Sequence, residues 1–171
     1  MTILPEQISA MIEAELSTIS DSRVESHVRR LLVEPTAIMR DWDYGAPDEA
    51  HPCWSVLEHS RSNTGIVYCE SGFGPRSPWG LVMLPDPSPT SMGMDCGWFG
   101  SFMDAYFDSM AVTELPIWRV FKQTSTTYPG SALTNELDWD SAWAEINRLR
   151  ATDSSVRYHC CQDRWIWPEK S

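Results

Sequence analysis

Three short apolar runs follow one another closely in the middle of the chain. They are C-W-S-V-L-E-H (53–59), G-I-V-Y-C-E (65–70) and W-G-L-V-M-L (79–84), and turn-forming residues separate them. Parallel neighbouring strands need a crossover connection of about a dozen residues or more, which these gaps cannot hold. Together with T-A-I-M-R-D-W-D-Y (36–44), the spacing therefore predicts an antiparallel meander of three or four strands.

Helical periodicity is found on both sides of this meander. Apolar residues recur at helical spacing in 5–19 and 22–33, which predicts two N-terminal helices that form a hairpin. The stretches 101–110 and 138–150 predict two more helices. Further strands are expected at 116–122 and in the tail 157–171.

This order of elements is typical of the α+β class. We expect an antiparallel sheet of about four to six strands, with the N-terminal helical hairpin and two further helices packed on it. At 171 residues the chain is expected to be a single domain, 1–171, with the hairpin in 1–34 and the sheet with inserted helices in 36–171.

The stretch C-E-S-G-F-G-P-R-S-P-W-G (69–80) raises the question of a phosphate-binding loop. A Walker loop needs a lysine that this stretch lacks, and a dinucleotide fingerprint needs a third glycine where Ser77 stands. Pro75 and Pro78 also remove N–H groups that a phosphate would bind. We therefore interpret the stretch as a proline-stiffened hairpin loop that displays Phe73 and Arg76.

The formal net charge of the chain is −11 at pH 7, and its sequence pI is about 4.6. An acidic surface repels nucleic-acid backbones and anionic membranes, so neither is expected as a partner. A protein that is basic at the contact fits this charge, and a chain that is monomeric on its own is expected. Solubility alone is the alternative explanation of the charge.

The five cysteines and four histidines give no strong sign of a metal or disulfide site. An odd, scattered set of cysteines without ligand spacing indicates reduced, buried thiols and a cytoplasmic location. The N-terminus has neither the basic nor the apolar region of a signal peptide. Adjacent ligands such as His159-Cys160-Cys161 rarely bind one zinc ion together. No metal and no cofactor are expected.

No motif in the chain names a reaction, so we expect no enzyme activity. One alternative is a small cytosolic hydrolase or transferase that uses a thiol or a carboxylate. A Cys–His dyad built from Cys53 or Cys69 with His59 is the thiol version. Paired acids are the carboxylate version, although Asp138 and Asp140 stand at a predicted helix start, where acids usually act as caps.

Acidic and aromatic residues gather instead in a pattern that is typical of a protein-binding surface. D-W-D-Y (41–44) and D-E (48–49) place four acids and two aromatics close together. Aromatic residues and arginine supply most binding energy at protein interfaces. The predicted partner-binding residues are Asp41, Trp42, Asp43, Tyr44, Asp48, Glu49, Phe73, Arg76, Asp95, Trp98 and Phe99.

The segment H-P-C-W-S-V-L-E-H-S-R-S-N-T-G-I-V-Y-C-E-S-G-F-G-P-R-S-P-W-G-L-V, followed by S-M-G-M-D-C-G-W-F-G-S-F-M-D-A-Y-F-D-S, covers roughly 51–110. It resembles small proteobacterial immunity proteins of polymorphic toxin systems, including Rhs and type VI secretion systems. The resemblance implies a cytosolic inhibitor that binds its cognate toxin domain, such as an ADP-ribosyltransferase or nuclease. The inhibitor would block the toxin's active site or its target-binding face.

Overall fold

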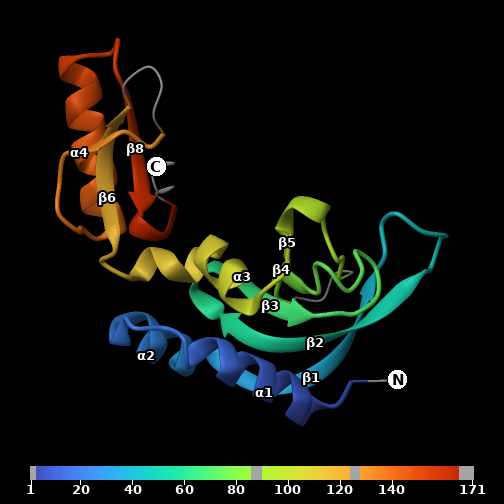
Figure 1. Cartoon of the computed structure of the whole chain (residues 1–171). Helices are drawn as coiled ribbons and strands as arrows, with labels where there is room; N and C mark the ends of the chain where they lie inside the picture. Colours follow the sequence, from blue (N-terminus) through green and yellow to red (C-terminus); the bar gives the residue numbers. More distant parts are fainter. Residues whose placement is uncertain (1–2, 86–89, 124–127, 166–171) are drawn as a thin grey trace. The chain divides into compact units, whose positions relative to one another are not determined.

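The computed structural model describes residues 3–85, 90–123 and 128–165 (Figure 1). The chain divides into two compact units, Met1–Val112 and Thr113–Ser171, and each unit is described by itself. The prediction of one domain for 1–171 stays a prediction. Among the described residues, none of the helices combines the length and the apolar character needed to cross a bilayer.

The first unit contains the predicted meander as a five-stranded antiparallel sheet within the described residues. Its strands are adjacent in chain order, and Tyr68 pairs with Trp79 across one hairpin. The first strand ends at Asp41, before the end of the predicted strand 36–44, and the second begins at Ala50, before the start of the predicted strand 53–59. The strands are β1 (Leu32–Asp41), β2 (Ala50–His59), β3 (Thr64–Tyr68), β4 (Trp79–Met83) and β5 (Trp98–Phe99).

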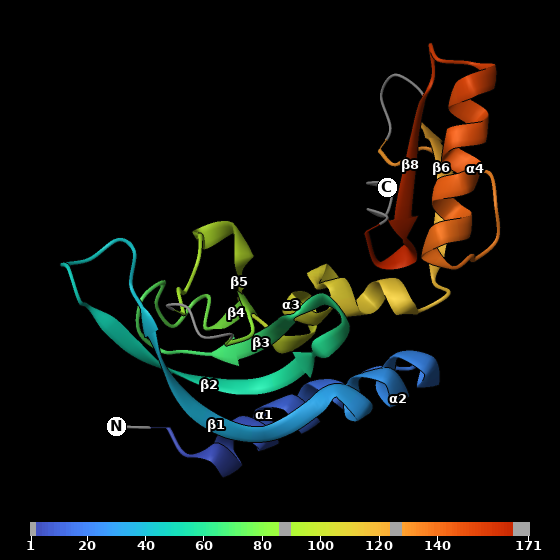
Figure 2. The same ribbon diagram turned by 180° about the vertical axis from the view of Figure 1, so that it is seen from behind.

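Within the described residues, the same unit contains three α-helices: α1 (Pro5–Leu16), α2 (Ser22–Leu31) and α3 (Phe102–Asp108). Both Figure 1 and Figure 2 show α1 and α2 running along the β1–β2 part of the sheet. The carboxylate of Glu15 accepts hydrogen bonds from the backbone N–H groups of Phe102 and Met103, at 3.0 and 2.8 Å. A side chain of α1 therefore caps α3 and satisfies two donors that a helix start leaves free.

The two faces of the sheet are covered by different parts of the chain, because side chains alternate along a strand. On one face Tyr68 packs against Trp79, and Trp79 packs against Phe102 of α3. On the other face the buried Val67 and its neighbours pack against residues from the segment 90–99. That second cluster consists of Cys53, Val67, Cys69, Val82, Met92 and Trp98.

The second unit consists of a small antiparallel sheet and a helix that packs on it. It contains β6 (Trp118–Gln123), β7 (Ser131–Ala132), α4 (Trp139–Thr152) and β8 (Arg157–Gln162), with the strands in the order β7-β6-β8. Helix α4 contacts β6 and β8 and buries Ile146. The α+β class, the antiparallel pairing and the N-terminal helices are thus confirmed, and the described strands belong to two sheets. Residues 166–171 of the predicted tail strand lie outside the described residues.

Candidate binding surface

The connection between β1 and β2 is a tightly bonded loop of residues 42–49. The N–H of Trp42 donates to the carbonyl oxygen of Glu49 at 2.8 Å, and the N–H of Gly45 donates to that of Trp42 at 3.2 Å. A carboxylate oxygen of Glu49 accepts from the N–H of Ala46 at 2.9 Å. These bonds fix the loop that carries five of the predicted residues: Trp42, Asp43, Tyr44, Asp48 and Glu49.

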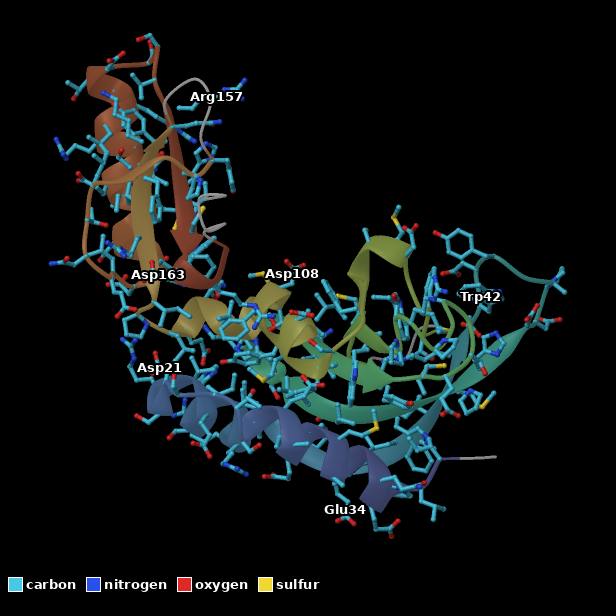
Figure 3. All side chains as sticks on the ribbon, in the orientation of Figure 1. Asp21, Glu34, Trp42, Asp108, Arg157 and Asp163 are labelled. Atoms are coloured by element: carbon cyan, nitrogen blue, oxygen red, sulfur yellow. The ribbon has the colours of Figure 1, made fainter. Side chains whose placement is uncertain are left out.

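Four of the predicted residues form an aromatic cluster: Trp42, Tyr44, Phe73 and Trp98. Phe73 is at its centre, with ring-centroid distances of 4.8 Å to Trp42, 5.7 Å to Tyr44 and 5.4 Å to Trp98. Tyr44 is 58 % exposed, whereas Trp42 and Phe73 are half-buried. The cluster therefore presents one open ring backed by rings that packing holds in place. Figure 3 shows Trp42 near the β1–β2 connection.

Phe73 reaches the cluster from the loop between β3 and β4. The N–H of Cys69 donates to the carbonyl oxygen of Pro78 at 2.8 Å, which closes the loop as a hairpin. Gly72 has a φ of +72°, and a Cβ there would lie 2.7 Å from Cε of Met92 and 3.2 Å from Cζ3 of Trp42. Glycine suits both the backbone conformation and the close approach. The interpretation of 69–80 as a hairpin loop is confirmed.

Trp98 packs against Phe73 on the buried side of the cluster and is not accessible to a partner. It is 6 % exposed, and its indole N–H donates to the carbonyl oxygen of Met92 at 2.9 Å. The prediction of Trp98 as a contact residue is therefore wrong, because its apolar area is used in the core. Phe99 is half-buried in β5, opposite Trp79. Arg76 and Asp95 are exposed.

Four acidic residues lie in the same connection as Trp42 and Tyr44 or directly before it. Asp41, Asp43, Asp48 and Glu49 are all exposed. We name these four residues the acidic loop. The strand predicted over 36–44 would place Asp41 and Asp43 on one face of the sheet, but β1 ends at Asp41. Asp43 lies in the loop and accepts a hydrogen bond from the hydroxyl of Ser91.

Two residues of this surface were not among the predicted site residues. Ser91 joins Asp43 to the backbone of Gly93, whose N–H donates to the serine hydroxyl at 2.8 Å. His51 packs against Trp42 at 5.6 Å between ring centroids and lies 3.5 Å from the carboxylate of Glu49. The contact between His51 and Glu49 could have been predicted, because the two residues are close in the sequence. No local pattern in the sequence indicates that Ser91 belongs to this surface.

The candidate thiols are buried away from solvent, although the hydrogen bond with Cys53 lowers the pKa of the Cys69 thiol. Cys53 and Cys69 are 0 % and 1 % exposed, and the hydrogen bond to Cys69 together with burial raises the pKa of the Cys53 thiol. A thiolate is the reactive form of cysteine. Nδ1 of His59 lies 2.6 Å from the hydroxyl of Ser62. All five cysteines are free.

The remaining candidates have structural roles. Asp138 caps α4 by accepting from the N–H of Ser141 at 2.9 Å, as its position predicts. Within the described residues, no group of three or more histidine, cysteine or acidic side chains is placed to hold a metal ion.

Comparisons with protein-family models, curated proteins and solved structures find no match to this chain.

Proposed function

We propose that this chain is an immunity protein of the bacterial cytoplasm. It binds and inhibits a cognate antibacterial toxin domain, such as an ADP-ribosyltransferase or nuclease, by covering its active site or its target-binding face. The observation that supports this proposal best is the exposed ring of Tyr44, backed by Trp42 and Phe73, in a chain segment that also carries the exposed acidic loop.

This arrangement combines the two properties that a tight inhibitor needs. Aromatic side chains held in place by packing lose little conformational entropy on binding, so a partner gains most of their contact energy. The acidic loop and the net charge of −11 attract a basic surface and accelerate encounter. Toxin domains that act on nucleic acids or nucleotides need basic residues at their active sites, which makes such a surface a suitable target.

The thiol alternative has weaker support. Cys53 and Cys69 are buried, and the exposed Cys96 lies outside the aromatic cluster.

The proposal is tested with the protein encoded next to this chain in its genome. Co-expression should restore growth to cells that produce that protein, and the purified pair should elute as a one-to-one complex. A matched strain that expresses this chain with Tyr44→Ala and Trp42→Ala should lose the protection. If the wild-type chain gives neither protection nor a complex, the proposal is wrong.

A further inference from the structure

A cavity of about 520 Å³ lies in the first unit beside β4 and the segment 90–93. Its size is in the usual range of small-molecule sites. Most of its wall is apolar and includes Leu81, Val82, Leu84, Met92 and Met110.

One positively charged side chain, Arg40 of β1, also forms part of this wall. It is 1 % exposed. Its Nη1 donates to the carbonyl oxygen of Ser91 at 3.1 Å, and its Nη2 donates to that of Met83 at 3.0 Å. Its Nε is buried and has no hydrogen-bond acceptor. A guanidinium has five N–H donors, so two carbonyl oxygens leave most of them unused.

No carboxylate among the described residues forms an ion pair with Arg40. Burial accordingly lowers the pKa of its guanidinium. A buried charge is costly unless an opposite charge or further hydrogen bonds compensate it. A negatively charged group that entered the cavity would supply both to Arg40. The chain therefore contains a ready recognition group for an anion.

The rest of the wall restricts what the anion can be. The apolar side chains favour a ligand whose larger part is hydrophobic. Asp108 also lines the cavity, and its negative charge repels a ligand that carries two or more negative charges. We propose that this cavity binds a small monocarboxylate with an apolar chain, whose carboxylate accepts hydrogen bonds from Arg40. The proposal does not rest on the proposed protein-binding function, although Ser91 belongs to both the cavity wall and the candidate binding surface.

Methionine methyl groups report on this cavity directly, because Met83, Met92 and Met110 line it. We would titrate the full chain, labelled with [methyl-¹³C]methionine, with octanoate and with 1-octanol as the uncharged match. Octanoate should shift these three signals and leave those of Met11 and Met39 in place. The dissociation constant for octanol should be at least about tenfold higher, because charge-assisted hydrogen bonds are lost. Equal affinities for the two compounds would overturn the proposal.

Two variants test the site itself. Arg40→Gln should bind octanoate no better than octanol. Because this buried substitution can prevent folding, Leu81→Trp is the second variant: it fills the cavity and should abolish binding, whereas Met94→Trp, which changes an exposed residue outside the cavity wall, should not. Octanoate binding that survives Leu81→Trp contradicts the proposal.

A third variant addresses residues 86–89, which lie outside the described residues and include Asp86. If wild-type protein ignores octanoate and Asp86→Asn binds it, a carboxylate of the chain itself neutralises Arg40, and the proposal fails. If wild-type and Asp86→Asn proteins bind octanoate alike, the proposal stands.

Discussion

Trp42 and Phe73 pack edge to face with their ring centroids 4.8 Å apart, and they belong to two different hairpin connections. Trp42 follows β1 at the start of the connection 42–49, and Phe73 lies between β3 and β4. Their contact joins the two loops into one surface. Edge-to-face pairs contribute about 0.5–1.5 kcal/mol beyond the area that they bury, so the rings stabilise each other's position before any partner arrives.

The close approach of the two loops can be tested at Gly72. Gly72→Ala should lower the free energy of unfolding by more than Gly74→Ala. Both glycines have a positive φ, so both substitutions incur a similar backbone cost of about 1 kcal/mol. Only at position 72 does a Cβ meet other side chains, since nothing lies within 4 Å of one at position 74. Urea denaturation measures the difference, and equal losses would contradict the packing described for Gly72.

The acidic loop should accelerate association with a basic partner. Asp41→Lys should reduce the association rate constant about two- to fivefold at low salt, with little change at high salt, because salt screens exposed charges. Glu34→Lys makes the same charge change near the other end of β1, and Figure 3 shows Glu34 apart from Trp42. Stopped-flow binding to the cognate protein measures both rates. The same slowing in both variants would mean that only net charge matters.

The five cysteines should react very differently with iodoacetamide. Cys96 is exposed and should be alkylated within minutes in the native protein, whereas Cys53, Cys69 and Cys161 are buried and should be protected. Burial raises the pKa of Cys160 to about 12, which keeps its thiol protonated near neutral pH. Peptide mass spectrometry after timed quenching identifies each site. Rapid labelling of Cys53 or Cys69 would revive the thiol-enzyme alternative.

Asp108 should destabilise the protein more as pH rises. Burial raises its pKa above 3.8, so the folded state holds this proton more tightly than the unfolded state. The destabilisation caused by Asp108 therefore begins as the pH rises through 3.8. It is complete once the folded protein has lost the proton. Asp108→Asn should raise the free energy of unfolding at pH 7 by less than about 1 kcal/mol, since the residue is partly exposed. Its position at the last residue of α3, where a negative charge is unfavourable, acts in the same direction.

The pH dependence separates this explanation from a general effect of the substitution. The difference between Asp108→Asn and wild type should disappear well below pH 3.8. There the protonated aspartic acid is as neutral as asparagine in both the folded and the unfolded state. A difference that persists there shows that the asparagine acts through packing.

Local patterns in the sequence are sufficient to predict much of this fold. Periodicity locates α4, and the short gaps between apolar runs require antiparallel pairing of β2, β3 and β4. The pairing of β6 with β8 joins segments far apart in the chain, so no local pattern indicates that a second sheet forms. The predicted boundaries of β1 and β2 were also shifted, because hydrogen bonds within the connecting loop, such as that from Trp42 to Glu49, determine where the strands end.

The candidate surface was predicted in part for similar reasons. Trp42 and Tyr44 were predicted because aromatics among acids suggest a binding surface, and Phe73 because a proline-stiffened loop carries it beside Arg76. These patterns could not distinguish them from Trp98, since a tryptophan can be buried when its N–H finds an acceptor, here the carbonyl oxygen of Met92. The alternation of β1 puts Arg40 on the face of Ile38, yet only the three-dimensional structure shows a cavity beside it.

The exposed aromatic ring in the acidic surface is the centre of this account, and the affinity of the Tyr44→Ala variant for the cognate protein tests it most directly. Tyr128→Ala is the matched control, because Tyr128 is 48 % exposed and belongs to the second unit. We expect Tyr44→Ala to raise the dissociation constant at least about tenfold and Tyr128→Ala to leave it within about twofold of wild type. Unchanged affinity in Tyr44→Ala, with the complex still formed, would show that the partner binds elsewhere on the chain.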